Sequence, residues 1–175
     1  MHQLKAVTAR DRLKARYIQF CKNPLRDEKA LAAEFEQLAL LPKVTHIALR
    51  DPHTLMVGTS VISITEPKTD VVYDVGEFII YLYRQRQGRI WDTGFYFQNI
   101  NGTVDGYHHP HINVRDVPGF GELGLLCIQR GHFHIYQHLR SGEMHFAVSL
   151  LIDVLQTYDG KGIYRPVEMW PRRRT

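Results

Sequence analysis

Residues 76–85 read "GEFIIYLYRQ", and this stretch decides the fold class because the strand that it predicts is apolar on both faces. Two sets of side chains alternate along it, namely Phe78, Ile80 and Leu82 on one face and Ile79, Tyr81 and Tyr83 on the other. A strand with this pattern is covered on both sides and lies inside a sheet. We therefore expect further strands beside this one and helices packed against the sheet.

Three neighbouring segments predict the partner strands. They are residues 44–50 ("VTHIALR"), 54–65 ("TLMVGTSVISIT") and 89–100 ("RIWDTGFYFQNI"). The first two are rich in β-branched residues and flank the turn "DPH" at 51–53, so they predict a hairpin. The last one ends at Asn101-Gly102, a dipeptide typical of tight turns. Because the four strands follow one another along the chain, they predict an antiparallel meander.

Helical periodicity marks both ends of the chain. One helix is predicted over 9–21 and a second over the stretch "DEKALAAEFEQLALL" at 27–41, and a third is predicted over 143–158. The residues between 107 and 134 show no clear period. The chain is therefore expected to be α+β, with a four-stranded antiparallel meander sheet on which the N-terminal helices and one C-terminal helix pack.

The composition indicates one globular domain without a membrane span. The chain has 175 residues, 44% of them hydrophobic and 23% charged, and no apolar run approaches the roughly 18 residues of a membrane helix. We expect a single domain over 1–175, with a core at about 27–158 and a basic tail at 160–175. The first residues carry positive charge without a following apolar stretch, so a secretory signal is not expected.

The cysteine content and the charge of the chain limit which cellular location and which partners we expect. Two cysteines, Cys21 and Cys127, are too few for a disulfide-stapled secreted domain and fit a reducing compartment, so the cytoplasm is the expected location. The net charge of +4 comes largely from the chain ends and from "RQRQGR" at 84–89. No base-stacking or groove-reading motif accompanies this charge, so nucleic-acid binding is not expected.

The segment 107–113, "YHHPHIN", holds three histidines, and Cys127 follows sixteen residues after the last of them in "GLLCIQ". Reactive thiols and metal sites both use such residues. Two His-x-His pairs occur: His109 with His111, and His132 with His134. Residues two apart on a strand face the same side, so either pair could grip one metal ion, although no acidic residue completes a known ligand spacing.

The order of the expected elements, together with four local features, resembles the ubiquitin-conjugating enzyme superfamily, which includes RWD-like and bacterial members. Two of the features are the strand "GEFIIYLYR" and the helix that follows the cysteine. The other two are short motifs: Tyr107, His109, Pro110 and Ile112 match the signature Tyr-His-Pro-Asn-Ile with one extra histidine inserted, and Gly124 and Cys127 match Gly-x-x-Cys-Leu. The resemblance spans residues 27–158 and implies a fold of this family's type.

Three departures from the family pattern point to a bacterial branch or to a non-catalytic relative. His111 stands where the family has an asparagine that stabilises the oxyanion, although Asn113 lies two residues further on. The stretch between Ile112 and Cys127 is longer than usual, and the Tyr-Pro-Phe-x-Pro-Pro motif after the third strand is absent. An imidazole N–H can also donate to an oxyanion, so His111 could take over this role.

The resemblance implies an enzyme that carries a ubiquitin-like protein as a thioester on Cys127 and transfers it to an amine. The implied site consists of Cys127 as the nucleophile, His111 and Asn113 on the oxyanion side, Tyr136 packing the active-site loop, and His109 and Pro110 pinning a turn. An activating enzyme and a ubiquitin-like protein are the implied partners, and no cofactor is expected. The amino-terminal helices and the "RQRQGR" turn are the surfaces expected to meet the activating enzyme.

Three other interpretations stay open from the sequence. The first is a catalytically inactive RWD-like module that binds proteins, in which Cys127 is a buried structural residue. The second is the histidine metal site, and the third is a hydrolase in which a histidine activates Cys127. Cys21 lies on the apolar side of a predicted helix and is expected to be a core residue.

Overall fold

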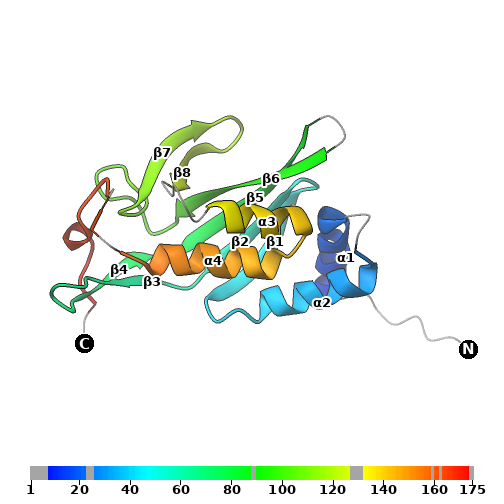
Figure 1. Cartoon of the computed structure of the whole chain (residues 1–175), viewed down its shortest axis with the longest axis horizontal. Coiled ribbons are helices and arrows are strands. Elements are labelled where there is room, and N and C mark those ends of the chain that lie inside the picture. Colours follow the sequence, from blue (N-terminus) through cyan, green and yellow to red (C-terminus); the bar gives the residue numbers. More distant parts are fainter. Residues whose placement is uncertain are drawn as a thin grey trace, which may run out of the picture.

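The fold is described by a computed structural model over residues 8–22, 26–87, 90–126, 132–158, 160–161 and 163–173, of which 85–87, 90–93 and 132 are described by their backbone alone. Helices and strands alternate in blocks along these ranges (Figure 1). The helices are α1 (Ala9–Cys21), α2 (Glu28–Ala39), α3 (His132–Ser141), α4 (Met144–Gln156) and the short 3₁₀ helix η1 (Val167–Met169). The strands are β1 (Val44–Asp51), β2 (Thr54–Thr59), β3 (Ile62–Thr65), β4 (Val72–Gly76), β5 (Phe78–Gln87), β6 (Ile90–Asn99), β7 (Ile112–Val117) and β8 (Gly121–Leu126).

The described strands form a six-stranded antiparallel sheet in the order β1-β2-β5-β6-β8-β7 and a separate two-stranded sheet of β3 and β4. The prediction of a four-stranded meander with N-terminal helices and one C-terminal helix is therefore wrong. The chain is α+β, but two strands extend the sheet beyond β6, two others leave it, and four α-helices are present among the described residues.

The β7–β8 hairpin comes from a segment in which the sequence shows no clear period, because its strands are short and interrupted by glycine and charged residues. Its turn contains Gly119 and Gly121, whose φ angles of 80° and 78° lie in the left-handed region that favours glycine. The hairpin joins β6 through the pair of Phe97 with Gly124. The sheet is thus extended by a hairpin that begins directly after the histidine-rich segment.

The predicted strand at 54–65 consists of two strands that belong to different sheets. Between β2 and β3, the backbone N–H of Ser60 donates to the carbonyl oxygen of Lys43 at 2.8 Å, and the Thr59 hydroxyl accepts from the backbone N–H of Phe78 at 3.0 Å. β3 then pairs with β4, which the sequence pattern does not predict. An apolar run that is continuous in sequence can therefore change sheets at a polar Thr-Ser step.

Both amino-terminal helices begin at side-chain caps. The Thr8 hydroxyl accepts from the backbone N–H of Asp11 at 3.1 Å, and the backbone N–H of Thr8 donates to the Asp11 carboxylate at 3.0 Å, which completes a capping box. Asp27 caps α2 by accepting from the backbone N–H of Ala30 at 2.7 Å. The hydrogen bonds to Thr8 also hold the pKa of Asp11 below its usual value.

The helix predicted at 143–158 is α4, and α3 is a further helix that the sequence pattern does not predict. α3 packs against α4 and β6. The buried side of α4 consists of Met144, Ala147, Val148, Leu151, Ile152 and Leu155. Phe146, by contrast, is 49% exposed.

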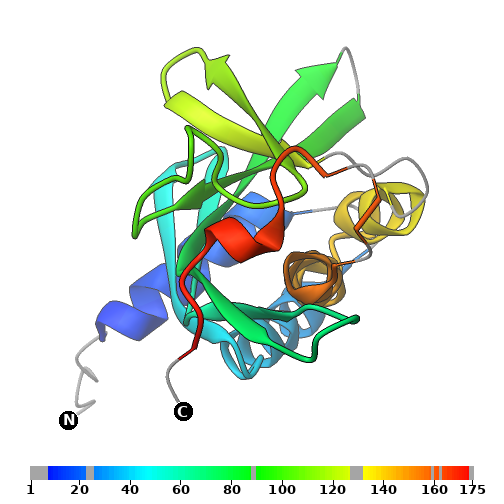
Figure 2. The ribbon, with the colours of Figure 1, turned by 90° about the vertical axis from the view of Figure 1, so that its left-hand side faces the viewer.

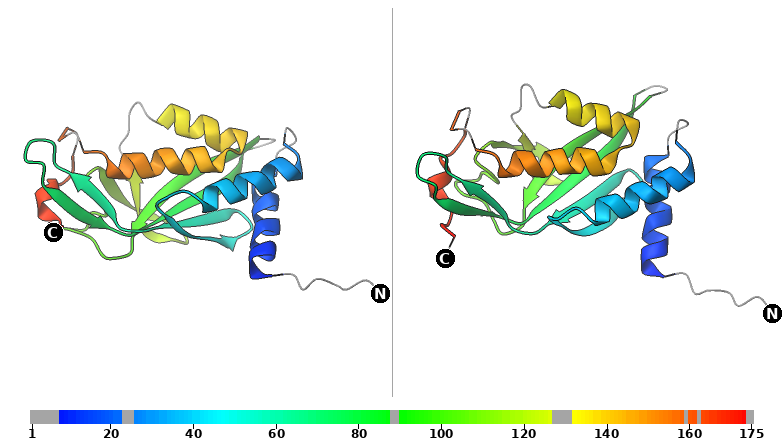
Figure 3. Two further views of the ribbon diagram at one scale, coloured as in Figure 1. Left: turned by 90° about the horizontal axis from the view of Figure 1, so that it is seen from below. Right: turned by 60° about the horizontal axis from the view of Figure 1, so that its bottom comes forward.

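The helices cover one face of the large sheet, with α2, α3 and α4 running along it and α1 standing at its end beside β1 and β2 (Figures 1 and 3). The largest fully buried side chains between these layers include Tyr17, Phe20, Phe35, Phe78 and Phe97. α1 adds Tyr17, Phe20 and Cys21 to this hydrophobic core. Of the helices that are described, none has the length and apolar character needed to cross a membrane.

Residues 163–173 form a segment that we call the C-terminal strap, which runs from the histidine-rich turn to the edge of β4 (Figure 2). Its far end is firmly anchored, because Val167 is fully buried and Trp170 is 3% exposed. The backbone N–H of Arg173 donates to the carbonyl oxygen of Val72 at 2.9 Å, and the backbone N–H of Asp74 donates to that of Pro171 at 2.9 Å. This part of the predicted basic tail is therefore packed against the fold.

Candidate functional site

The histidine-rich segment forms a turn between β6 and β7 that is held from inside the protein by His109. The His109 side chain is fully buried, and its Nε2 lies 2.8 Å from the carbonyl oxygen of Leu155 at the end of α4. Its Nδ1 accepts from the backbone N–H of His111 at 3.1 Å. Because Nδ1 is an acceptor, the proton must be on Nε2, and both ring nitrogens are satisfied in the neutral imidazole.

Burial lowers the pKa of His109 to about 3, because the charged form would lose its hydration, and the nearby His111 acts in the same direction. The hydrogen bond to Leu155 acts in the opposite direction but is smaller. His109 is therefore neutral at physiological pH. This geometry is that of a structural residue that fixes the Pro110 turn onto α4.

His108, the residue that has no counterpart in the family signature, pins the other side of the turn. Its Nδ1 accepts from the backbone N–H of Asn99 at 3.2 Å, and the Asn99 side chain donates to the carbonyl oxygens of Val75 at 2.8 Å and His108 at 3.1 Å. His108 is 6% exposed, and burial lowers its pKa below the usual value. The end of β6, the turn and β4 are thus joined by one buried polar cluster.

The chain reaches the turn through a tight reversal at Val104–Tyr107. Val104 and Tyr107 exchange two backbone hydrogen bonds of 2.9 Å, and the two residues between them, Asp105 and Gly106, have positive φ angles of 50° and 82°. Asp-Gly with both φ angles positive is the arrangement of a type I′ turn. The Asp105 side chain at this turn is 57% exposed.

The C-terminal strap crosses the turn on its outer side. The backbone N–H of Tyr164 donates to the carbonyl oxygen of Pro110 at 2.8 Å, and the Tyr164 ring stacks on that of Tyr107 with centroids 5.6 Å apart. Arg165 lies over the Tyr107 ring at 4.6 Å from its centroid, and its Nε lies 3.3 Å from a carboxylate oxygen of Asp105. The strap therefore contacts the residues on both sides of the buried His109.

His111 and Asn113, the predicted oxyanion residues, follow directly. His111 is partly exposed, and its ring centroid lies 5.6 Å from that of Tyr158, just after α4. Asn113 is the second residue of β7, pairs with Leu125 of β8, and is partly exposed. Both residues are accessible from the surface, while Ile112 between them is fully buried.

Cys127, the predicted nucleophile, lies outside the described residues. Its covalent neighbour Leu126 is described and pairs with Ile112, which follows His111 in the chain. The β7–β8 register thus places Leu126 beside the residue that follows His111.

Cys21, the other cysteine, is a core residue, as the sequence predicts. It is 2% exposed at the end of α1, and burial raises its pKa to about 12. At neutral pH this thiol is therefore protonated and shielded from solvent.

The remaining predicted residues, Gly124 and Tyr136, are structural. Tyr136 of α3 packs against Phe95 of β6, with ring centroids 5.6 Å apart. Gly124 lies where β8 meets β6, and a Cβ atom there would overlap Cγ2 of Ile112 and lie 3.2 Å from the carbonyl oxygen of Phe97. Only glycine allows this close approach of the hairpin to β6.

Gly124→Ala should lower the free energy of unfolding by about 2 kcal/mol, because neither the buried Ile112 nor the backbone of Phe97 can move without repacking the turn. Gly58→Ala is the matched control: its Cβ would meet the ring of His46, which is exposed and can rotate away. Urea unfolding monitored by circular dichroism measures both variants. Equal losses at the two positions would contradict the close approach at Gly124.

The histidines do not assemble the predicted metal site around His109. Both of its ring nitrogens are already hydrogen bonded, so a metal ion would have to displace Leu155 or the backbone of His111. His134 is an exposed residue of α3, and the side chain of His132 lies outside the described part of the chain. Within the described ranges, no three histidine, cysteine, aspartate or glutamate residues are grouped so as to hold a metal ion.

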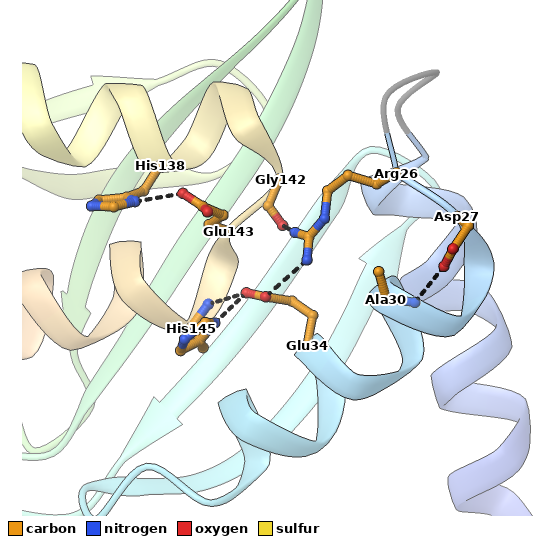
Figure 4. A network of polar contacts seen from close by, with 8 residues as sticks. All are labelled: Arg26, Asp27, Ala30, Glu34, His138, Gly142, Glu143 and His145. Carbon is orange, nitrogen blue, oxygen red and sulfur yellow. Dashed lines mark hydrogen bonds and ion pairs between the residues drawn. The ribbon is translucent and has the colours of Figure 1, made fainter.

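A buried charged network, which the sequence pattern does not reveal, joins α2 to the start of α4 (Figure 4). Glu34 is 2% exposed, and its Oε1 accepts from the backbone N–H of His145 at 2.7 Å and from His145 Nδ1 at 2.6 Å. Its Oε2 accepts from Arg26 at 3.3 Å, and Arg26 also donates to the carbonyl oxygen of Gly142 at 2.5 Å. The only sequence signal is a glutamate between Leu31 and Phe35 on the apolar side of a helix.

Arg84, the first residue of the "RQRQGR" segment, is not a free surface charge. Its guanidinium donates to the carbonyl oxygen of Phe20 and lies 3.5 Å from that of Lys22, so it holds the carboxyl end of α1. The side chains of the other five residues lie outside the described part of the chain.

No family model, no curated protein and no solved structure matches this chain. Its function is therefore inferred from its own residues and contacts.

Proposed function

We propose that this protein carries a ubiquitin-like modifier as a thioester on Cys127 and passes it to an amine beside the 107–113 turn. The observation that carries the proposal is the pairing of Ile112 with Leu126. In this pair the segment that contains His111 and Asn113 lies next to Leu126, the residue before Cys127, although Ile112 and Leu126 are fourteen positions apart in the chain.

Two acyl transfers make up the proposed reaction. The Cys127 thiolate attacks the carbonyl carbon of the modifier's terminal residue, which the activating enzyme holds as a thioester. A new C–S bond forms as the old one breaks, and the departing thiolate stays on the activating enzyme. An amine then attacks the same carbonyl carbon, a C–N bond forms, the C–S bond breaks, and the amine loses a proton to solvent or to a nearby base.

The turn supplies what these steps need, namely fixed donors beside a developing oxyanion. His109 and His108 lock the backbone from inside, so the partly exposed His111 and Asn113 sit on a rigid base. The imidazole of His111 has an N–H to donate, and Asn113 carries the amide that the family asparagine provides. We assign oxyanion stabilisation to these two side chains and thioester formation to Cys127.

The proposal includes two protein partners and a location. An activating enzyme must supply the modifier, and a target protein must supply the amine. Both steps need a reduced thiol, which the cytoplasm of a bacterium maintains. We assign the exposed basic residues of α1, Arg12 among them, to the surface that binds the activating enzyme.

Loading with an activating enzyme, ATP and a ubiquitin-like protein from the same genome tests the proposal. A covalent adduct should form that thiol reductants cleave, and Cys127→Ser should give an adduct that resists them or none at all. Cys21→Ala, which changes the buried thiol, should load like the wild type. An adduct that persists in Cys127→Ala would contradict the proposal, and no adduct with any encoded modifier would favour the protein-binding module.

A further inference from the structure

We infer that Asp105 and Tyr107 form a binding site for the cationic side chain of the target protein, and that Arg165 occupies this site as an internal substitute until the target displaces it. The inference rests on the proposed function, because the amine that receives the modifier would come from a lysine. The ligand class is a primary ammonium on an alkyl chain, and a guanidinium would bind in the same way.

The turn chemistry presents the two recognition groups side by side. The type I′ turn at Asp105-Gly106 projects the Asp105 carboxylate, whose side chain is 57% exposed, while Tyr107 offers one ring face. A carboxylate beside an aromatic face attracts a cation in two ways, through charge and through the ring quadrupole. Asp105 has a positive φ of 50°, a backbone conformation that aspartate and asparagine adopt more readily than most residues.

Arg165 already makes both kinds of contact. Its guanidinium carbon lies 4.6 Å from the Tyr107 ring centroid, and its Nε lies 3.3 Å from Asp105. Yet this Nε has no hydrogen-bond partner although the atom itself is buried, so the ion pair is made without good hydrogen-bond geometry. Asp105 and Tyr107 thus attract a cation, but Arg165 does not form a good hydrogen bond with Asp105.

The strap is built so that Arg165 can leave while the rest stays folded. Val167 and Trp170 are buried and hold the far end, where Arg173 also pairs with Asp74 at 3.0 Å. The contacts of the Arg165 side chain lie nearer to solvent, since this side chain is 36% exposed and that of Asp105 57%; its Nη1 also donates to the carbonyl oxygen of Tyr164 at 2.9 Å. Exposed ion pairs contribute little to stability, so displacement of Arg165 needs only a modest gain.

The position of this site beside the turn gives it a role in transfer. Tyr164, the neighbour of Arg165, is hydrogen bonded to Pro110, the residue before His111. A target that engages Asp105 and Tyr107 therefore arrives on the same turn that presents His111. Because Arg165 belongs to the same chain, it competes at a high effective concentration and disfavours cations that lack further contacts with the protein.

Nuclear magnetic resonance of the Tyr107 ring tests the site without any conjugation partner. Nα-acetyl-lysine methylamide should shift the Tyr107 signals in a saturable way, and Arg165→Ala should bind it about fivefold more tightly than the wild type. The uncharged norleucine analogue should give no such shift. Arg173→Ala, which changes the far end of the strap, is the matched control and should bind like the wild type. Equal affinity in wild type and Arg165→Ala, or equal shifts with both analogues, would overturn the inference.

A second measurement links the site to transfer. With the thioester formed, Arg165→Ala should speed discharge to the lysine analogue several-fold but leave discharge to hydroxylamine, which is small and uncharged, unchanged. The double variant Asp105→Asn with Arg165→Ala should lose this faster discharge to the lysine analogue. Asparagine is chosen because it adopts the same positive φ as aspartate. Failure to form a thioester would count against the proposed function alone, because the resonance titration decides the cation site independently.

Discussion

Acidification from pH 7 to pH 5 should lower the free energy of unfolding by about 2 kcal/mol through His109 alone. Burial holds the pKa of His109 at about 3 in the folded protein, whereas the unfolded side chain has the ordinary value of 6.5. Below pH 6.5 the unfolded state therefore binds one proton more than the folded state, and stability falls as the pH falls. The full stability is present above pH 6.5, and the loss continues down to about pH 3, where it reaches roughly 5 kcal/mol.

Urea unfolding at pH 7, 6 and 5 measures this slope in a window that lies above the titration of most carboxylates. His108, whose pKa burial also lowers, adds to the slope in the same direction. His109→Gln should be less stable at pH 7 but should lose most of the His109 contribution to the slope. His134→Gln, an exposed histidine of α3, is the matched control and should keep the wild-type slope. A wild-type slope in His109→Gln would show that His109 titrates normally in the folded state.

Glu34→Ala should destabilise the protein by about 3 kcal/mol or more, because it removes the acceptor of three buried donors at once. The His145 backbone N–H would lose its acceptor, and the Arg26 guanidinium would lose its carboxylate and keep only the carbonyl oxygen of Gly142. Replacing one member of a buried charged group is more harmful than replacing the whole group by apolar residues, since the remaining charge is uncompensated.

Glu36→Ala gives the matched control for Glu34, two residues further along the same helix. Glu36 is exposed and pairs with Arg10 and with Lys14 at 2.8 Å, and the hydrogen bond from Lys14 lowers its pKa. Removing an exposed pair should leave the unfolding midpoint almost unchanged. Thermal unfolding followed by circular dichroism compares the two variants. Similar midpoints for both would contradict the description of Glu34 as the centre of a buried network.

The sequence predicted those helices and strands whose own residues carry a clear local signal, such as a regular pattern of apolar side chains or a cap. The helices at 9–21 and 28–39 begin at side-chain caps, and β5 and β6 each contain a run of apolar or aromatic residues, so local chemistry decides them. The β7–β8 hairpin depends instead on glycine turns, and the position of β3 in a second sheet depends on contacts with distant residues such as Lys43. No local period encodes these tertiary choices, and the predicted sheet was wrong for that reason.

The same distinction applies to the site. That His109 and Pro110 pin a turn was implied by the resemblance and not by residue spacing. The acceptor at Leu155 lies 46 residues away, and Arg165 reaches Asp105 only because the strap folds back. Neither contact leaves a trace in residue spacing. Glu34 leaves only a weak signal, a lone carboxylate on the apolar face of a helix, and this signal does not identify Arg26 or His145 as its partners.

The central claim is that Cys127 accepts an acyl group from a thioester, and acyl transfer from a small donor tests this without any partner protein. The donor is the glycyl-glycine thioester of 2-mercaptoethanesulfonate, offered at pH 7.5, and intact-protein mass spectrometry detects the product. Cys21 provides an internal comparison, because burial raises its pKa to about 12 and keeps it from acting as a nucleophile.

The account predicts a single adduct that hydroxylamine removes, that Cys21→Ser retains and that Cys127→Ala abolishes. His111→Ala should slow its formation, because the oxyanion would lose a donor. An adduct on Cys21, or a Cys127 that stays unmodified while the same cysteine in the urea-unfolded chain reacts, would contradict the claim that this protein is a thioester carrier.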